Sequence, residues 1–383
     1  MKLLIHHHTL AYSDNKGIWI QSFIGSWVNE LSKHTESIGL LLSTTSTKKS
    51  NLDYCLQSSN VKVESIGNID YNYNKIIRYF NAKEKCKSIY GYTHLLIRGI
   101  TPKQMLVFNN INVKKKYFLF VGCVTDSEKN IPNNFYDIYN LIMKKFRFFQ
   151  LKKIAKNSKI ATNSPTTVIE MENILKIKSD FIPTNTISIK KFKKIKRTRH
   201  RKSINLIFVG RIQKEKGINE LIEAFLSLND ENKTIDFSLD IVGPISVNYF
   251  DELKASYPSI IKKIKFHGFI KFSDELLDLY DKADIYLLPS YHEGFPHTIW
   301  EAAARNLPII CTNVGGIGGL IDKSMVTFVE KKNVESLKNA INKLIYSVND
   351  TTKKSEKIFQ FAKDYSVEES AKKLINWLES EKE

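Results

Sequence analysis

Short apolar runs alternate with segments of helical periodicity along almost the whole chain. In the first half the apolar runs occupy residues 3–5, 38–42, 61–66, 94–97, 117–124, 159–162 and 180–183. In the second half they occupy residues 205–209, 237–242, 264–267, 285–288 and 308–312. Between them, stretches such as residues 18–31 place apolar side chains every three or four positions, which is typical of amphipathic helices. Strands that alternate with helices predict parallel sheets with helices on both faces, so the predicted fold class is α/β.

A strongly basic stretch separates the two series of strands. Residues 188–202 read SIKKFKKIKRTRHRK and contain nine Lys or Arg but no acidic residue. A charge run without an apolar face is typical of a solvated linker, although it could also be a surface that faces anionic lipid headgroups. Because 383 residues suffice for two domains, we predict doubly wound domains over residues 1–187 and 203–365, with a ligand-binding cleft between them.

The composition narrows the class of protein. Hydrophobic residues make up 42% of the chain, which is too many for a disordered protein, and the net charge of +18 indicates an anionic partner such as nucleic acid, a membrane surface or a phosphorylated ligand. The four cysteines are widely scattered and have no metal-ligand spacing, as expected of free thiols in a reducing cytoplasm. The sequence contains no run of 18 apolar residues and no signal-peptide pattern, so we expect a cytoplasmic protein.

Two cations follow the first strand of the second series. Gly210 permits a tight turn directly after that strand, and Arg211 and Lys216 are five residues apart in the loop that opens the next helix. A helix N-terminus attracts phosphate through its free N–H groups and its dipole, and two cations placed there suit a diphosphate. The alternative is that both are ordinary surface residues.

Two glutamates follow the strand at residues 285–288. Glu293 falls in the loop after this strand and Glu301 about one turn into the following helix, near the carboxyl edge of the sheet, where folds of this class bind ligands. One carboxylate could accept hydrogen bonds from sugar hydroxyls and the other from ribose hydroxyls, while Gly294 and the residues after it could offer backbone N–H groups. The alternative is a helix whose start is merely capped and charged by acids.

Together the two segments resemble the retaining glycosyltransferases of family 4, which have the GT-B fold of two Rossmann-like domains facing a cleft. That family carries a G-R-x-x-x-x-K-G loop, here residues 210–217, and an E-x7-E motif downstream, here residues 293–301. The resemblance is strong over residues 203–322. It implies that Arg211 and Lys216 contact the donor diphosphate. It also implies that Glu293 faces the transferred sugar and that Glu301 holds the ribose. The implied donor site comprises Gly210, Arg211, Lys216, Glu293, Gly294, Phe295, Pro296 and Glu301.

Two positions depart from the family pattern. Asn306 stands where a Gly is usual. Residues 318–321 read GGLI, where the family tends to place a Glu before an apolar pair. Because of these departures the resemblance does not specify which nucleotide and sugar are preferred, but the predicted class is unchanged.

The first half matches the family more loosely, and the resemblance implies that residues 1–187 are the acceptor-side domain and residues 203–365 the nucleotide-sugar-binding domain. Gly17, in the turn after the first strand, is the candidate for close backbone approach to the donor phosphates. Asp126 follows a strand after which the family often places a catalytic His or Asp, although it could equally be a helix cap. His residues 6–8 and Arg98 are weaker candidates. As in GT-B proteins, we expect residues 366–383 to form a terminal helix that returns to the N-terminal domain.

The resemblance implies a retaining transfer of sugar from a nucleotide-diphosphate sugar, with a UDP-sugar favoured, to a saccharide or lipid-linked acceptor. No two aspartates are two residues apart, so the sequence lacks the D-x-D motif of the metal-dependent alternative fold, and we expect neither a metal nor another cofactor. The resemblance and the basic charge favour bacterial surface polysaccharide synthesis, such as capsule or lipopolysaccharide.

Basic residues interleaved with aromatic ones at 144–153, and the lysines at 114–116, suggest peripheral contact with anionic membrane; a helix with a solvated Lys face is the alternative. Two other classes remain open: a basic nucleic-acid-binding protein, and a GT-B protein with epimerase-like or phosphorylase-like chemistry. The basic segments contain no recognised nucleic-acid-binding motif, so we expect no nucleic-acid partner.

Overall fold

The computed structural model describes residues 1–71, 74–122, 124, 135–197, 202–258 and 263–380. The chain forms two compact units. Unit 1 comprises Met1–Thr186 and Val367–Glu383, and unit 2 comprises Ile187–Ser366. Asp126 lies outside the described residues.

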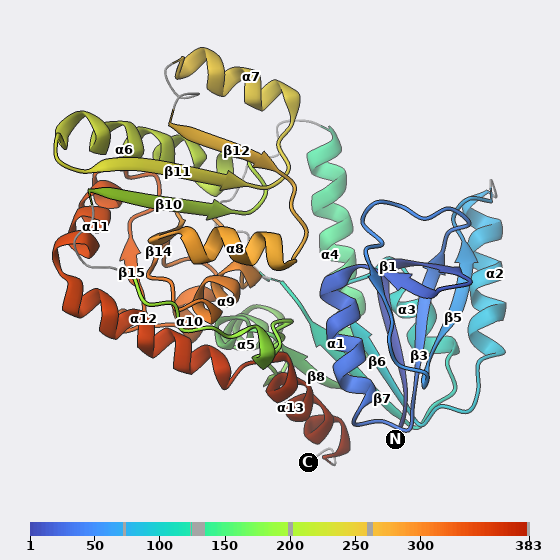
Figure 1. The fold of residues 1–383 in the computed structure, drawn as a ribbon. Helices are drawn as coiled ribbons and strands as arrows, with labels where there is room; N and C mark the ends of the chain where they lie inside the picture. The colour runs from blue at the N-terminus through green and yellow to red at the C-terminus, as the bar shows by residue number, and fades with distance from the viewer. Residues whose placement is uncertain (72–73, 123, 125–134, 198–201, 259–262, 381–383) are drawn as a thin grey trace. The chain divides into compact units, whose positions relative to one another are not determined.

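Unit 1 is built on a parallel sheet in which the strands run in the order β5-β3-β1-β6-β7-β8-β9 (Figure 1). Its strands are β1(Lys2–Asp14), β2(Gly17–Ile20), β3(Ser37–Thr44), β4(Tyr54–Cys55), β5(Val61–Asn68), β6(His94–Arg98), β7(Lys115–Phe120), β8(Lys159–Thr162) and β9(Asp180–Phe181). Its helices are α1(Ser22–Ser32), α2(Lys75–Lys87), α3(Gln104–Asn110), α4(Phe135–Ala155), α5(Pro165–Glu170), the π-helical turn η1(Met171–Leu175) and α13(Val367–Glu379).

Helices cover both faces of this sheet because successive strand residues point to opposite sides. Leu3 and Ile5 belong to one apolar core, together with residues of α1 and α13. Leu4, between them, belongs to a second core formed with α2, α3 and α4. The terminal helix α13 is held in unit 1 by Trp377, whose Nε1 donates to Asp180 Oδ2 at 2.7 Å.

The turn after the first strand differs from the prediction. A helix is expected directly after Gly17, but residues 17–20 form β2, which pairs antiparallel with the end of β1. The Asp14 carboxylate closes this hairpin by accepting hydrogen bonds from the Lys16 backbone N–H at 2.9 Å and from Trp19 Nε1 at 3.0 Å. Gly17 therefore lies at a hairpin tip, with a φ of 135°, rather than at a helix N-terminus.

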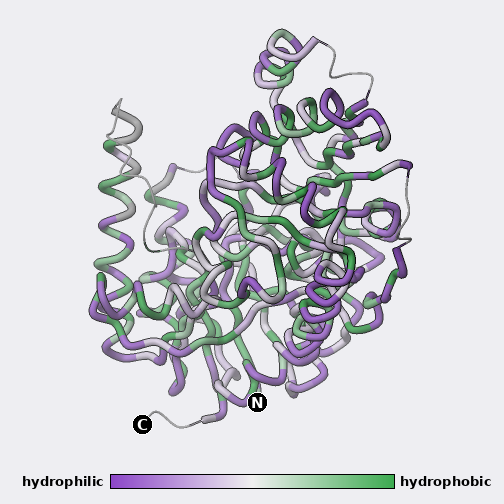
Figure 2. Tube along the Cα trace, turned by 90° about the vertical axis from the view of Figure 1, so that its left-hand side faces the viewer, coloured by the Kyte–Doolittle hydropathy of each residue, from purple (hydrophilic) through white to green (hydrophobic). Residues whose placement is uncertain are grey.

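Unit 2 is a six-stranded parallel sheet in the order β12-β11-β10-β13-β14-β15 (Figure 1). Its strands are β10(Ser203–Val209), β11(Asp236–Val242), β12(Ile264–Gly268), β13(Ile285–Leu288), β14(Ile309–Thr312) and β15(Thr327–Val329). Its helices are η2(Ile189–Lys191), η3(Lys214–Lys216), α6(Ile218–Glu231), α7(Val247–Ser256), α8(Asp274–Lys282), α9(His297–Ala304), α10(Ile317–Leu320), α11(Val334–Tyr346) and α12(Val348–Lys363). Hydrophobic and hydrophilic residues alternate along the helices, as amphipathic packing requires (Figure 2).

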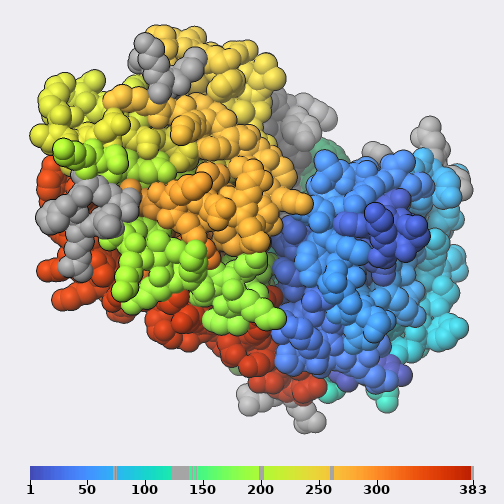
Figure 3. Space-filling view, in the orientation of Figure 1, coloured from blue at the N-terminus to red at the C-terminus, as the bar shows by residue number. Residues whose placement is uncertain are grey.

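The basic stretch is not a solvated linker over its described residues, so that expectation is wrong for residues 188–197. Arg197 donates hydrogen bonds to the backbone carbonyls of Ala283 at 2.8 Å and Asn306 at 2.8 Å. Lys191 pairs with Asp274 at 2.5 Å, and the segment lies against α8 on the surface of unit 2 (Figure 3). Cations that bind backbone carbonyls and acids of one unit become part of that unit's packing.

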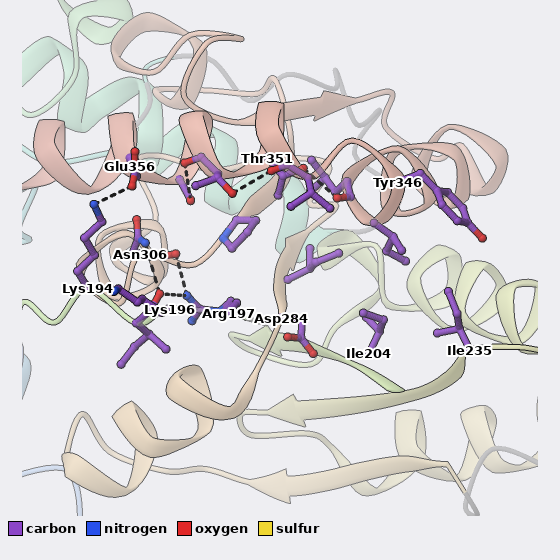
Figure 4. Close-up of a pocket in the computed structure, with 18 of the residues that line it drawn as sticks. Lys194, Lys196, Arg197, Ile204, Ile235, Asp284, Asn306, Tyr346, Thr351 and Glu356 are labelled. Carbon is purple, nitrogen blue, oxygen red and sulfur yellow. Dashed lines mark hydrogen bonds and ion pairs between the residues drawn. The ribbon is translucent and has the colours of Figure 1, made fainter. Parts of the chain in front are cut away.

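An open cavity of about 940 Å³ lies beside this segment, at the edge of the sheet where β10 and β13 begin (Figure 4). Lys194, Lys196 and Arg197 line one side of it, and Glu356 of α12 pairs with Lys194 at 2.7 Å. The basic segment thus spans from α8 to α12 within unit 2.

Candidate functional site

The residues that the sequence singles out in unit 2 meet at the carboxyl edge of its sheet. Gly210 follows β10, and residues 289–296 follow β13, which is the neighbour of β10. The strand order reverses between these two strands, because β11 lies on one side of β10 and β13 on the other. Such a reversal opens a crevice at the carboxyl ends of the strands, where ligands of doubly wound sheets bind.

Three glycines let the loops at this edge approach one another closely. A Cβ on Gly243 would overlap the carbonyl oxygen of Gly210, and a Cβ on Gly315 would overlap that of Glu293. Gly217 begins α6 in the left-handed conformation with a φ of 70° and packs on the Pro289 carbonyl. These contacts are between backbone atoms, so the loops have fixed spacing.

Lys216 and Glu293 form an ion pair at the centre of this edge. The Lys216 ammonium donates to Glu293 Oε1 at 2.6 Å, and Ser290 Oγ donates to the same oxygen at 2.8 Å. Only 12% of the Lys216 side chain and 11% of the Glu293 side chain are exposed. Lys216 is therefore not an ordinary surface lysine, and a bound anion would share it with Glu293.

Arg211 presents a second cation at the start of the same loop. Its side chain is exposed, unlike that of Lys216. The two cations therefore differ: Lys216 pairs with a carboxylate and is largely buried, whereas Arg211 is exposed at the edge of the sheet.

The loop between β13 and α9 is anchored to α6. Tyr291 donates its hydroxyl hydrogen to Glu220 Oε1 at 2.6 Å, and its backbone N–H donates to the Glu215 carbonyl at 2.8 Å. This anchoring fixes Glu293, two residues later, against Lys216. The sequence reasoning missed Ser290 and Tyr291, because neither residue type is diagnostic without knowing that the two loops touch.

Glu301 is buried within α9. Glu301 is 8% exposed. Tyr280 of α8 donates its hydroxyl hydrogen to Glu301 Oε2 at 2.8 Å. Burial raises the pKa of the Glu301 carboxyl to about 7. The first turn of α9 contains no acid, so the alternative that the two glutamates merely cap and charge a helix start is wrong.

Aromatic rings pack the middle of α9 against the end of α12 and the turn that follows it. The Phe295 ring stacks on Trp300 with 4.8 Å between centroids, and Trp300 stacks on Tyr365 at 5.5 Å. The Phe295 side chain is thus engaged in packing. Gly294 is fixed by its carbonyl, which accepts from the Gly316 N–H at 2.7 Å.

The burial of Glu301 has a measurable consequence for stability. Its pKa of about 7 in the folded state exceeds the ordinary value of 4.5, so the folded state holds this proton more tightly than the unfolded state. The contribution of Glu301 to stability is therefore largest at low pH and declines by about 3 kcal/mol as the pH rises from about 4.5 to 7. Glu301→Gln stays neutral and lacks this decline.

We expect the free energy of unfolding of Glu301→Gln minus that of wild type to increase when the pH is raised from 5 to 8. Urea unfolding of both proteins at the two pH values measures this difference. Stability profiles that run parallel between the two proteins would contradict the assignment of the raised pKa to Glu301.

Within the described part of the chain, no group of three or more His, Cys, Asp or Glu side chains is arranged to hold a metal ion. Among the same residues, no helix has the length and apolar character needed to cross a membrane.

Residues 189–363 match the family model described as glycosyl transferases group 1. The chain is 36% identical over 137 residues to the putative teichuronic acid biosynthesis glycosyltransferase TuaC of Bacillus subtilis (strain 168), which covers 36% of this chain and 32% of that protein. It is 30% identical over 144 residues to the capsular polysaccharide biosynthesis glycosyltransferase CapM of Staphylococcus aureus, which covers 36% of each chain. The matched region therefore spans about a third of these curated relatives.

Similarity to solved structures extends over the whole chain. The structure of Alr3699/HepE from Anabaena in complex with UDP and glucose superposes with a TM-score of 0.70, at 14% identity, and covers 100% of both chains. This likeness confirms the predicted GT-B fold.

Proposed function

Because this chain belongs, through residues 189–363, to the glycosyl transferases group 1 family, we propose that it transfers a sugar from a nucleotide-diphosphate sugar to a saccharide or lipid-linked acceptor. The observation that carries the proposal is the cluster of Arg211, Lys216 and Glu293 at the point where the strand order of unit 2 reverses. It combines cations for a diphosphate with a carboxylate for sugar hydroxyls in one place.

The cations serve the leaving group. As the bond between the sugar and the diphosphate breaks, negative charge accumulates on the diphosphate, and fixed cations stabilise that charge most when they need no rearrangement. The ion pair with Glu293 holds Lys216 in position, and the exposed Arg211 supplies the second cation for the diphosphate. The N-terminus of α9 adds N–H groups at the same edge. In this proposal the chain's own residues supply the stabilisation, and no metal is required.

The two carboxylates serve the donor's two sugars. Glu293 places a carboxylate beside Lys216 at this edge, and a carboxylate there can accept hydrogen bonds from hydroxyls of the transferred sugar. Glu301 accepts from Tyr280 at Oε2, and we assign its carboxyl to the ribose. We further propose that the anomeric configuration is retained, by attack of the acceptor hydroxyl on the face that the diphosphate leaves.

The relatives favour particular substrates. HepE is solved with UDP and glucose, and TuaC and CapM are described as acting in teichuronic acid and capsular polysaccharide biosynthesis. We therefore favour a UDP-sugar as the donor and a surface polysaccharide or its lipid-linked precursor as the product. Gly17 and Asp126 of the N-terminal region remain proposed contributors to the donor phosphates and to catalysis, respectively.

A thermal-shift screen against UDP, GDP, ADP and their sugars, without added metal, tests the donor site. A nucleotide at one hundred times its Kd stabilises the protein by about 2.7 kcal/mol, which raises the Tm by several degrees. We expect a shift with one nucleotide in wild type and its loss in Arg211→Ala. A folded protein that responds to no nucleotide, yet is retained on DNA at low salt, would instead favour the nucleic-acid-binding alternative. Release of free sugar without an acceptor would favour other chemistry.

Helix α4 supports peripheral attachment to a membrane. It exposes a row of large apolar side chains, Ile138, Tyr139, Leu141, Ile142, Phe146 and Phe149. Exposed lysines flank them, and Lys153 lies over the Phe149 ring at 4.7 Å. Apolar residues beside cations suit the headgroup region of anionic lipid, and a lipid-linked acceptor would be met there.

Vesicle sedimentation tests this attachment. We expect the protein to bind phosphatidylglycerol vesicles, and Ile142→Ser with Phe146→Ser to weaken that binding at least about tenfold, because two apolar side chains no longer enter the bilayer. Ile76→Ser with Phe80→Ser, on the exposed face of α2, is the matched control. Equal binding by both double variants would contradict a specific role for α4.

A further inference from the structure

Arg98 is a buried cation without an acidic partner. It is the last residue of β6, at the carboxyl edge of the unit 1 sheet, and it is 2% exposed. Its guanidinium lies over the Trp27 ring, 5.0 Å from the centroid, and Nη1 donates to His7 Nε2 at 3.3 Å. Its Nε is buried and has no hydrogen-bond partner. Among the described residues, no Asp or Glu pairs with it.

Such an arrangement is costly unless something supplies the missing negative charge. A buried ion without a counter-ion is one of the most unfavourable groups a fold can contain, and an aromatic face compensates for it only in part. Burial lowers the pKa of Arg98 only to about 10, so it remains charged at neutral pH. His7 offers no anion: its pKa falls to about 2 through burial and the nearby Arg98 charge, so it is a neutral acceptor.

The surroundings of Arg98 include open space and an exposed imidazole. His8 is exposed, and its ring is tilted by 35° against that of His7 with 4.2 Å between the centroids. Gly99, the next residue after Arg98, has a φ of 79° and nothing within 4 Å of the place where a Cβ would stand. Open space therefore adjoins the buried cation at the sheet edge where doubly wound folds bind ligands.

We propose that Arg98, with His7 and His8 beside it, binds an oxyanion of the acceptor, either a phosphate ester or a sugar carboxylate. This inference rests on the proposed function, and it adds that unit 1 contributes to binding of the acceptor. It narrows the acceptor to an anionic saccharide or lipid-linked sugar phosphate. Arg98 acts as a specificity-determining residue, because a neutral acceptor would leave the guanidinium uncompensated.

The test uses the full chain and three probes: inorganic phosphate, glucuronate and glucose, at matched ionic strength. We expect phosphate, glucuronate or both to raise the Tm of wild type by at least about 2 °C, and glucose to leave it unchanged. Phosphate alone would indicate an ester acceptor, and glucuronate alone a carboxylate acceptor. The shift should be absent in Arg98→Met and reduced in Arg98→Lys, which keeps the charge but loses the planar fork.

Two further variants separate this site from others. Arg211→Ala should retain the anion shift, which places it outside the donor site, and Arg78→Met, which removes an exposed cation of α2, should retain it as well. Arg98→Met should keep its response to UDP. Failure of every variant and wild type to respond to UDP would count against the proposed function alone.

The stability of Arg98→Met in the absence of anion gives an independent result. Removal of an uncompensated buried charge should leave the Tm unchanged or raise it. A clear fall in Tm, or an anion shift that persists in Arg98→Met, would overturn the proposal and make Arg98 a purely structural residue. So would a wild type that responds to neither anion.

Discussion

Replacing Lys216 with Met is expected to lower the rate of sugar transfer by about 10²–10³-fold, the loss that follows removal of one preorganised group that stabilises developing charge. The ammonium lies 2.6 Å from Glu293 and is largely shielded from water, so its charge acts on a bound diphosphate with little screening. Initial rates with the donor identified by thermal shift, compared at saturating donor, measure the effect.

The ion pair complicates this variant, and a second substitution resolves the complication. Lys216→Met removes the ammonium that pairs with the Glu293 carboxylate, which costs stability as well as activity. Lys216→Met combined with Glu293→Gln removes the uncompensated charge, so stability should recover, while activity should stay well below that of Glu293→Gln alone. Lys214→Met, an exposed lysine of the same turn, is the matched control and should transfer at the wild-type rate. A double variant as active as Glu293→Gln alone would show that Lys216 acts only by folding the loop.

The strands of unit 2, and the positions of its candidate residues at the ends of those strands, were predictable from sequence because each depends on a short-range pattern. An apolar run followed by Gly210 and a helical stripe specifies a strand, a turn and a helix N-terminus, and Arg211 and Lys216 fall within that local frame. The position of Glu301 in a helix after a buried strand was predictable for the same reason. None of these inferences needs a contact between residues far apart in the chain.

The errors arise where long-range contacts decide the structure. The basic stretch has no apolar periodicity, and nothing local reveals that Arg197 satisfies carbonyls near residues 283 and 306. At Gly17 the Asp14 carboxylate accepts a hydrogen bond from Trp19 Nε1. This contact stabilises a hairpin at residues where local pattern predicts the start of a helix. Lys216 and Glu293 are 77 positions apart in the chain, so their pairing could not be predicted from local pattern. The prediction gave each residue a separate part of the donor, whereas in the structure the two side chains bind each other.

Gly315→Ala is expected to abolish detectable donor binding and to destabilise unit 2 by about 3–5 kcal/mol. Gly315 has a φ of 56°, and the carbonyl oxygen of Glu293 occupies the place where a Cβ on residue 315 would stand. Because the obstacle is backbone, no side-chain rotation relieves the overlap, and the loop carrying Glu293 has to move away. A displacement of about 1 Å at a positioning group already costs on the order of 10²-fold in rate.

A matched variant separates this overlap from backbone strain. Gly268→Ala places the same methyl at a similar φ of 68°, but nothing lies within 4 Å of the added atom. It should therefore cost only the left-handed strain of about 1–2 kcal/mol and leave nucleotide affinity unchanged. If Gly315→Ala behaved like Gly268→Ala in both denaturant unfolding and nucleotide titration, the Glu293 loop would be movable, and the ion pair with Lys216 rather than the glycine contact would be what positions the carboxylate.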